Sequence, residues 1–382
     1  MKQILILMKV TIIGAGIGGL TTALALKKAN IPFQLVESAP EIKAVGAGII
    51  LANNAMQVFE KLGIHKQIEK QGNKINQMLI SKANFSPLSE LNLEPFEKKY
   101  HLQNHAIHRA DLHRILVQAI GEEQLILNKK LTNIEQNDST YMLKFEDGST
   151  LETTYIIGAD GIHSKVRELF FGDCPLRDSK QWCWRGVSTF QPPNTHRALE
   201  AWGAGARFGM VPLSSDKVYW YFTLNDHLGD LNDSLDKHSY RFHSLAQKII
   251  DATPVEQHIK TKIFDLKPIH QWQKDKVCLL GDAAHATTPN LGQGACQAIE
   301  DAYILGELMQ KHDIQKAFEM YPEIRRKKAH FVVNTSWKFG GLAQIENKFG
   351  QQFRNFIVKN FISKRSQEKQ LEHLFQLDEI PN

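Results

Sequence analysis

The chain has 382 residues, of which 42% are hydrophobic and 23% charged, and its formal net charge is +5 at pH 7. This length and composition predict one large or two closely joined globular domains with a substantial core. Basic residues alternate with acidic ones, which argues against a nucleic-acid-binding stripe. The four cysteines have no metal-binding spacing, so we expect free thiols, no metal site and a reducing, cytoplasmic environment.

The first residues, MKQILILMKV, resemble a signal peptide only superficially. Lys9 interrupts the apolar run, glycine-rich turn sequence follows at once, and there is no small-residue cleavage site. We predict a short leader before a buried first strand, with Met8 as an alternative start. No segment reaches about 18 uninterrupted apolar residues, so we expect no membrane-spanning helix.

The first predicted unit is a βαβ unit with a glycine loop at its first turn. Residues 9–14 form a β-branched run, residues 20–29 have apolar side chains at helical spacing, and residues 32–38 form a second strand. Gly14, Gly16 and Gly19 form GxGxxG, in which the glycines permit the tight turn, the approach of phosphates and close helix packing. Glu37 ends the second strand, where a carboxylate can accept hydrogen bonds from ribose hydroxyls. The unit predicts NAD or FAD rather than NADP; the alternative is a turn that serves packing alone.

The next elements predict an α/β protein with an inserted sheet. We expect a helix at 109–120, then strands within 125–136 and 141–160 joined by a hairpin-type EDGS turn. Residues 176–271 have alternating aromatic runs typical of an antiparallel sheet with one covered face. A buried strand at 277 and a helix at 293–311 resemble the strand and helix of the first βαβ unit, and a basic amphipathic helical tail follows.

A second glycine loop, GDAAHATTPNLGQG, begins at residue 281. Asp282 follows a strand, and Gly292, Gln293 and Gly294 present backbone N–H groups at the start of the 293–311 helix. Such a site favours negative charge that appears during a reaction. A flavin ring gathers such charge when reduced and a nicotinamide does not, so two loops favour FAD. The alternative is a helix that glycines cap for structural reasons.

These motifs together resemble the class A FAD-dependent aromatic hydroxylases, the para-hydroxybenzoate hydroxylase type. GAGIGG, GADGIHSKVR (158–167) and GDAAHATTPNLGQG occur in the family's order, and GAGIILANNAMQVFEKLG (46–63) and HRADLHRIL are similar to further family segments. The similarity spans residues 9 to about 305 and is greatest to urate hydroxylase, zeaxanthin epoxidase and salicylate hydroxylase types. It implies a Rossmann-like FAD-binding domain (1–75, 101–175 and 272–334), an inserted, mostly antiparallel β-sheet substrate domain (76–100 and 176–271) and C-terminal helices (335–382).

The resemblance also implies cofactor contacts. It places Arg109 at the FAD phosphates or ribitol, Leu131 at the adenine end, Asp282 at the ribityl chain and Pro289 at the flavin face. It makes Asp160 and Gly161 a link between FAD placement and NAD(P)H use. The full implied set is Gly14, Gly16, Gly18, Gly19, Glu37, Ser38, Arg109, Leu131, Asp160, Asp282, Pro289, Gly292, Gln293, Gly294 and Ala295.

Three charged residues near these motifs keep two interpretations. Arg167 supports the Asp-Gly motif in the resemblance, but Arg167 and Arg114 also fit ordinary salt-bridging helix residues. His285 is interpreted as structural rather than as an acid or base.

Three residues are the expected catalytic contacts with substrate. The resemblance to urate hydroxylase makes Arg207 an anion or oxyanion partner and Tyr219 a hydrogen-bond donor, with core packing as the alternative for Tyr219. The urate enzymes have an acid after the motif proline, whereas this chain has Asn290, which cannot act as acid or base. That difference argues against urate itself.

The resemblance implies a single-component monooxygenase. NADH or NADPH would bind transiently and reduce FAD, and a flavin C4a-hydroperoxide formed with O2 would hydroxylate a small electron-rich aromatic or heteroaromatic compound. Two alternatives remain: an epoxidase or reductase of an isoprenoid or olefin, and a non-enzymatic flavin-binding module. We expect a monomer or homodimer. Phe349, Phe353, Phe356 and Ile357 predict one apolar helical face, which either packs on the protein's core, the favoured interpretation, or lies on a membrane.

Overall fold

The computed structural model describes residues 10–41, 47–230, 232–233, 235–361 and 364–381. The predicted leader, the alternative start at Met8, and Lys9 and Gly46 of the predicted segments lie outside these residues.

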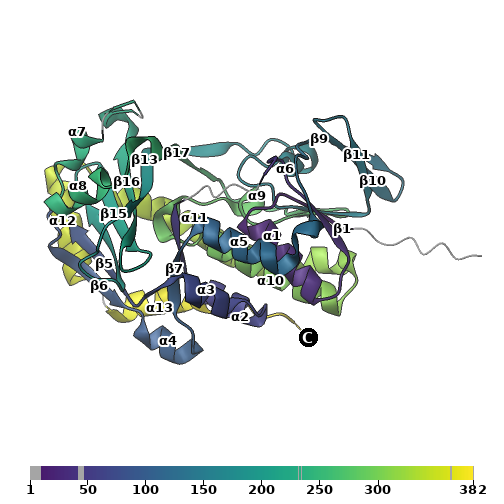
Figure 1. The fold of residues 1–382 in the computed structure, drawn as a ribbon, viewed down its shortest axis with the longest axis horizontal. Coiled ribbons are helices and arrows are strands. Elements are labelled where there is room, and N and C mark those ends of the chain that lie inside the picture. Colours follow the sequence, from purple (N-terminus) through teal and green to yellow (C-terminus); the bar gives the residue numbers. More distant parts are fainter. Residues whose placement is uncertain (1–9, 42–46, 231, 234, 362–363, 382) are drawn as a thin grey trace, which may run out of the picture.

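A six-stranded sheet, largely parallel, occupies one half of the molecule (Figure 1). Its order is β18-β19-β12-β1-β2-β8, and β1 pairs in parallel with both β12 and β2. β1 connects to β2 on one side, whereas β12 on its other side is followed by β19 farther from β1, so the carboxyl end of β1 is a topological switch point, where open α/β sheets bind ligands. The strands are β1 (Val10–Ile13), β2 (Phe33–Val36), β8 (Leu125–Ile126), β12 (Tyr155–Gly158), β18 (Gln273–Lys274) and β19 (Val277–Leu279).

Helices that follow these strands pack against one another. α1 (Ile17–Lys28) lies between α5 (Arg109–Ile120) and α10 (Gly294–Lys311) (Figure 1). The short helices α6 (Lys165–Phe171) and α9 (Asp282–His285) follow β12 and β19. The GxGxxG loop, the Asp-Gly motif and the second glycine loop therefore all leave the same edge of the sheet.

A seven-stranded sheet forms the other half. Its order is β17-β13-β16-β15-β14-β5-β6, and only β14 and β5 pair in parallel. One face is covered by α7 (Asp236–Ser239) and α8 (Ser244–Asp251), which bury a cluster that includes Phe208, Trp220 and Phe222. The strands are β5 (Gln77–Lys82), β6 (Pro87–Asn92), β13 (Leu176–Thr189), β14 (Arg197–Trp202), β15 (Ala206–Pro212), β16 (Lys217–Asn225) and β17 (Ile259–Leu266).

Two three-stranded sheets complete the strands of the described residues. One contains β9 (Leu131–Asn137), β10 (Thr140–Phe145) and β11 (Thr150–Thr153), and the other β3 (Gly48–Leu51), β4 (Asn73–Ile75) and β7 (Asn104–His108). The remaining short helices are α2 (Asn53–Lys61), α3 (His65–Gln71), α4 (Glu94–Tyr100) and the 3-10 turns η1 (Glu122–Gln124), η2 (Asp226–Leu228), η3 (Val255–Gln257) and η4 (Pro289–Leu291).

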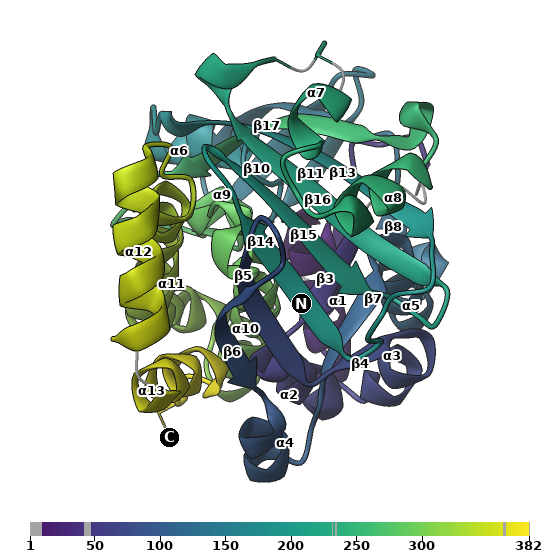
Figure 2. The same ribbon diagram turned by 90° about the vertical axis from the view of Figure 1, so that its left-hand side faces the viewer.

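Three helices form the C-terminal part. α11 (Ile314–Ala343) runs from the first half to the second, and α12 (Lys348–Asn360) and α13 (Lys364–Phe375) follow it. Figure 2 shows α12 at the outer left edge of the molecule, beside α11.

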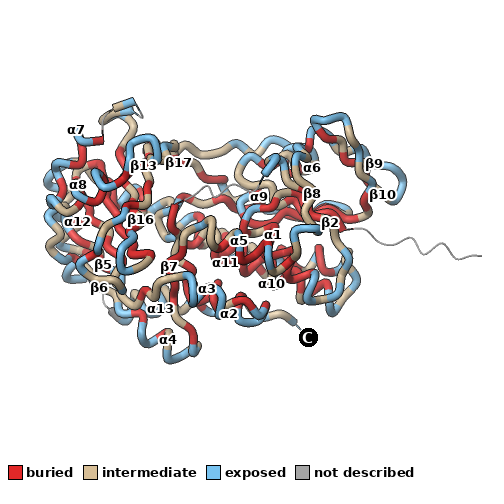
Figure 3. The backbone as a smooth tube through the Cα atoms, in the orientation of Figure 1, coloured by how far each residue is buried: buried red, intermediate tan, exposed pale blue. Residues whose placement is uncertain are grey.

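The fold class predicted from the sequence is confirmed. The main core surrounds α1, α10 and α11, where Figure 3 shows long buried stretches. The helices predicted at 109–120 and 293–311 are α5 and α10, and the EDGS turn joins β10 to β11. Within the described residues no helix is long and apolar enough to span a membrane. Nor does that part of the chain gather three His, Cys, Asp or Glu side chains in a metal-binding arrangement.

Candidate active site

The glycines of the first loop divide into those that packing requires and one that faces open space. Gly14 has φ +102°, and a Cβ there would lie 2.6 Å from the carbonyl oxygen of Ala159. A Cβ on Gly19 would lie 1.9 Å from the carbonyl oxygen of Gly14. A Cβ on Gly16 would have no atom within 4 Å, and no side chain caps α1 at this residue. The loop therefore leaves backbone N–H groups open at the positive end of a helix, which suits phosphate oxygens.

Glu37 joins the end of β2 to this loop. Its carboxylate accepts hydrogen bonds from the backbone N–H of Ala15 (2.7 Å) and Ala39 (2.9 Å) and from the Ser38 hydroxyl (2.9 Å). A carboxylate has about four acceptor positions, so Glu37 keeps capacity for a ribose hydroxyl. Leu131 is the first residue of β9 and is buried. The chain just before it runs beside Glu37, since the N–H of Lys129 donates to the Glu37 carbonyl (2.8 Å).

The Asp-Gly motif forms a tight turn held by its own carboxylate. Asp160 accepts from the Ser164 hydroxyl (2.5 Å) and from the N–H of Lys165 (2.7 Å) and Val166 (3.1 Å). Burial raises the pKa of Asp160 although these hydrogen bonds oppose the shift. Gly161 has φ +80° and faces open space. The carboxylate is occupied within the turn, so the motif presents backbone rather than this side chain.

Arg167 and Arg114 behave differently. Arg167 is buried and donates to the backbone carbonyl oxygens of Ile162 (2.6 Å) and Ala283 (2.9 Å), which ties the Asp-Gly turn to α9. Arg114 is paired with Asp111 one turn earlier on the surface of α5. The supporting interpretation thus fits Arg167, and the salt-bridging one fits Arg114.

Arg109 and Asp282 are charged residues at the edge where the motifs meet. Both side chains are exposed to solvent, and the protein atoms packed around each of them shift its pKa. Burial lowers the pKa of Arg109, and the Asp282 charge opposes this shift. Burial likewise raises the pKa of Asp282, against the opposing effects of His285 and Arg109. The pair can hold a polar ligand between opposite charges.

The second loop repeats the arrangement of the first. After Pro289 and η4, Gly292 has φ +63° and faces open space, and no side chain caps α10. The Gln293 side chain is buried and accepts from Asn54 (3.3 Å) and Gln297 (3.2 Å), so its backbone, not its amide, points to the loop's outer side. Gly294 and Ala295 open α10 with free N–H groups. Side chains cap α5, α6, α8, α11 and α12, whereas α2, α3, α4, α7 and α9 also begin without a side-chain cap.

A polar row crosses the face of the seven-stranded sheet opposite to α7 and α8. Arg185, Tyr221, Gly209 and Glu200 are paired in register on β13, β16, β15 and β14. The Tyr221 ring lies over Gly209, where a Cβ would be 2.1 Å from its Cζ, and the hydroxyl donates to Glu200. Burial and the Glu200 charge hold the pKa of Tyr221 well above its ordinary value. Only glycine at 209 lets the tyrosine reach across two strands.

Arg207 lies in the next row and joins the sheet to the second loop. It is fully buried and donates to the side-chain oxygen Oδ1 of Asn290 (2.7 Å), to the Thr223 hydroxyl (3.2 Å) and to Oε1 of Gln344 (3.2 Å). Its guanidinium lies 3.6 Å from Glu200. Asn290 in turn donates to the Thr288 hydroxyl (2.8 Å) and the Ser336 carbonyl (2.9 Å). Two of the three predicted catalytic residues are therefore in direct contact.

Tyr219 packs against apolar residues and also lies near two arginine side chains. Its ring packs against Gly48 of β3, where a Cβ would lie 2.5 Å from the tyrosine Cβ, and joins a small apolar cluster with Val211. Burial raises its pKa, and the charges of Arg185 and Arg109 oppose that shift. The residue therefore belongs to the interface between the two halves, with Arg109 and Arg185 nearby.

His285 is part of a buried charge network. Its Nε2 lies 2.6 Å from Asp301, which also accepts from Arg325 (2.8 Å). The side chain is buried beside Trp272. This geometry agrees with the structural interpretation.

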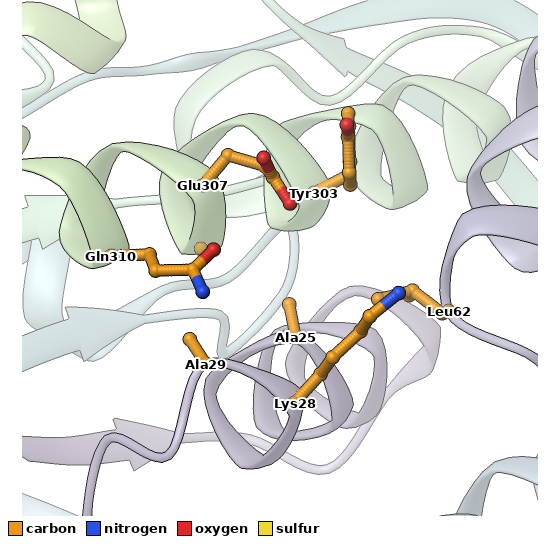
Figure 4. Close-up of a pocket in the computed structure, with 8 residues that line it drawn as sticks. Ala25, Lys28, Ala29, Leu62, Tyr303, Glu307 and Gln310 are labelled. Atoms are coloured by element: carbon orange, nitrogen blue, oxygen red, sulfur yellow. The ribbon is translucent and has the colours of Figure 1, made fainter.

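Figure 4 shows a depression between the C-terminal parts of α1 and α10. Tyr303, Glu307 and Gln310 face Ala25 and Lys28 across it. Its cavity volume of about 10 Å³ holds at most one water molecule. It lies at the opposite helix ends from the glycine loops and is no ligand site.

Sequence reasoning missed the row of Arg185, Tyr221 and Glu200. Each residue stands on a different strand, and only the strand register brings them together. One signal was present: in KVYWYFTL the alternation places Tyr219 and Tyr221 on the same face.

The chain belongs to the family described as the FAD binding domain, whose model matches residues 7–335. The fold, this family and the relatives named below define the class of the protein, which is an FAD-dependent monooxygenase. It is 32% identical to the aurachin C monooxygenase/isomerase of Stigmatella aurantiaca, over 93% of this chain and 95% of that one.

Two further proteins are similar over nearly the whole length. The 2-heptyl-3-hydroxy-4(1H)-quinolone synthase of Pseudomonas aeruginosa (strain PAO1) is 29% identical over 92% of this chain and 94% of its own. The solved structure of Klebsiella pneumoniae HpxO complexed with FAD and uric acid has a TM-score of 0.89 at 25% identity and covers 96% of both chains. The predicted family resemblance is thereby confirmed.

Proposed function

We propose that the protein hydroxylates a nitrogen heteroaromatic ring that carries an N–H and a carbonyl or hydroxyl group. NADH or NADPH is the electron donor and O2 the oxygen source. The polar row and the Arg207–Asn290 pair support this substrate class, because they set donors and acceptors side by side on one sheet face. The names of the quinolone synthase and of the uric acid complex point the same way.

The glycine loops fit FAD. Gly16, Gly161 and Gly292 face open space in three separate motifs, and the two helices at the glycine loops have no side-chain caps. We assign Gly14 to Gly19, Glu37, Ser38 and Leu131 to the adenosine and pyrophosphate half. Arg109, Asp160, Asp282, Pro289 and residues 292–295 belong to the ribityl and flavin half. FAD, when bound, supplies the redox chemistry that passes oxygen to the substrate.

The protein's own residues position the substrate. Glu200 is held by the Trp202 indole N–H (2.6 Å) and by Tyr221, so its carboxylate has a fixed orientation. Arg207 is held by Thr223, Gln344 and Asn290 and stabilises negative charge that develops on a substrate oxygen. Tyr219, two residues before Tyr221 on β16, donates to the substrate from the other side of the polar row than Arg207. The shared sheet keeps these groups rigid.

The observation that carries the proposal is the row Arg185–Tyr221–Glu200 beside Arg207. A pocket for an isoprenoid or olefin would be lined by apolar groups, whereas this face has two arginines, a tyrosine and a carboxylate. We therefore prefer hydroxylation to the epoxidase or reductase alternative.

The test is a substrate panel with the purified protein. NADH and NADPH oxidation would be followed with a 2-alkyl-4-quinolone, uric acid, a hydroxybenzoate and an isoprenoid olefin. We expect a yellow protein whose oxidation of one nucleotide rises at least tenfold with the quinolone. Stimulation by the olefin alone, or a protein that binds no FAD, would contradict the proposal. Replacing Asp282 by Ala should lower the FAD content sharply.

A further inference from the structure

We propose that the outer face of α12 binds an anionic lipid surface, so that the protein works at a membrane. Phe349, Phe353 and Phe356 of α12 and Phe361, which follows it, form this phenylalanine face. Their side chains are 79%, 60%, 55% and 67% exposed.

The phenylalanine face is continuous rather than scattered. Phe349, Phe353 and Phe356 stand at positions i, i+4 and i+7 of one helix, and the rings of Phe356 and Phe361 lie 5.5 Å apart. Single exposed apolar residues are ordinary, but a group of neighbouring aromatic rings marks an interaction site. The favoured interpretation of the predicted face of Phe349, Phe353, Phe356 and Ile357, packing on the protein's own core, is wrong for the three phenylalanines, whereas Ile357 is half-buried.

The inner face of α12 fixes this orientation. Arg354 and Val358 are buried. Arg354 donates to the carbonyl oxygen of Ala343 (2.8 Å) at the end of α11, and its guanidinium lies 4.9 Å from the Trp202 ring centre. Rotation of α12 that would bury the phenylalanines would break these contacts. Figure 2 shows the helix on the outside of the molecule, with α11 behind it.

The charged residues around the phenylalanine face indicate what kind of surface it binds. Residues 347–361 contain no Asp or Glu, and Lys348 and Lys359 are exposed on one border of the phenylalanine face. An anionic lipid surface takes up both features, since aromatic rings enter the headgroup boundary and lysines pair with phosphates. A second copy of this chain would set lysines against lysines, which disfavours self-association through this face.

The position of α12 connects this surface with the active site. Arg354 packs on Trp202, and Trp202 donates to Glu200 of the polar row. The helix therefore lies directly behind the proposed substrate site.

Vesicle co-sedimentation of the full-length protein tests the proposal. The probes are vesicles of phosphatidylcholine with phosphatidylglycerol and vesicles of phosphatidylcholine alone. The variants are Phe353→Ser with Phe356→Ser, and Lys348→Gln with Lys359→Gln. Tyr240→Ser is the matched control, because Tyr240 is 69% exposed beside α7 on another surface. No substrate or electron donor is needed, so the outcome is independent of the proposed function.

We expect binding to the anionic vesicles that falls at least tenfold in the phenylalanine variant. The lysine variant should lose about fivefold per charge, as expected for about 1 kcal/mol per basic residue near such a surface, and Tyr240→Ser should bind as the unmodified protein does. Absence of binding, or binding that the phenylalanine variant retains, would overturn the proposal. So would an oligomer that the phenylalanine variant converts to monomers, because the face would then join copies of the chain.

Discussion

Asn290 is the residue at which the second loop meets the sheet. Replacing it by Asp leaves an acceptor for Arg207 but removes the donor to the Ser336 carbonyl, which lies 2.9 Å away. Asp sets an acceptor oxygen against the Ser336 carbonyl oxygen where Asn donates to it, and a lost buried hydrogen bond costs about 1–3 kcal/mol. We expect Asn290→Asp to lower the free energy of unfolding by that amount, measured by urea denaturation. Asn137→Asp on exposed β9 is the control and should change nothing; equal effects of the two would contradict the buried network.

Tyr221 can be tested without changing its shape. Tyr221→Phe keeps the ring over Gly209 and removes only the hydroxyl that donates to Glu200. We expect kcat/KM for the proposed heteroaromatic substrate to fall about tenfold, or about 1.4 kcal/mol, with the FAD content unchanged. Tyr303→Phe, at the remote depression between α1 and α10, should have no effect. A full loss of FAD, or unchanged kcat/KM, would show that the row does not contact substrate.

The raised pKa of Tyr221 adds a pH prediction. Because burial and Glu200 favour its neutral form, the hydroxyl stays protonated at pH values where an ordinary tyrosine, with a pKa of about 10, ionises. Ultraviolet titration of tyrosinate should therefore give the same signal for unmodified protein and Tyr221→Phe up to about pH 10. A tyrosinate signal that the variant lacks would contradict the hydrogen bond.

Two glycines of the first βα turn allow the effects on cofactor binding and on folding to be tested separately. Gly16 has φ −67° and no atom near its Cβ position, whereas a Cβ on Gly19 would meet the Gly14 carbonyl oxygen at 1.9 Å. We expect Gly16→Ala to keep its stability within about 0.5 kcal/mol and to lose most of its FAD. We expect Gly19→Ala to lose about 1–3 kcal/mol, because α1 must move from β1. Flavin absorbance per protein and urea denaturation measure the two; full FAD occupancy in Gly16→Ala would contradict the phosphate assignment.

Some of these elements could be predicted from the sequence and others could not. Both glycine loops, α5, α10 and the hairpin between β10 and β11 follow from local patterns of period and turn residues. Glu200 and Tyr221 could not be found, because strand register is set by the whole sheet and a shift of one residue reverses the faces. The amphipathic pattern of α12 was visible in the sequence, but which face of the helix points outward was not. That orientation is set by Arg354, whose partners are Trp202 on β14 and Ala343 at the end of α11.

A buried charge network joins α9, α10 and α11 to Asp378, which follows α13. Arg325 on α11 pairs with Glu300 and Asp301 of α10 and with Asp378, and Asp301 contacts His285. These opposite charges lower the pKa of Asp301 to about 2, against the effect of burial. Because the folded-state pKa is below the ordinary one, this carboxylate stabilises the fold above about pH 4 and loses that effect as the pH falls to about 2.

Replacing Asp301 by Asn tests this network. We expect the free energy of unfolding of the unmodified protein to fall by about 2 kcal/mol more than that of the variant between pH 4 and pH 2. Urea denaturation across this range measures the difference. Parallel pH profiles would show that Asp301 titrates normally in the folded protein.

Oxygen transfer to a heteroaromatic ring is the central activity that we propose for the protein. Its most direct test is turnover of a 2-alkyl-4-quinolone by the FAD-loaded protein with NAD(P)H under oxygen-18-labelled O2, followed by mass spectrometry of the product. We predict a product that gains one labelled hydroxyl oxygen, with less of it from Tyr221→Phe. Nucleotide oxidation that yields only hydrogen peroxide, or a product oxygen that comes from water, would contradict the account.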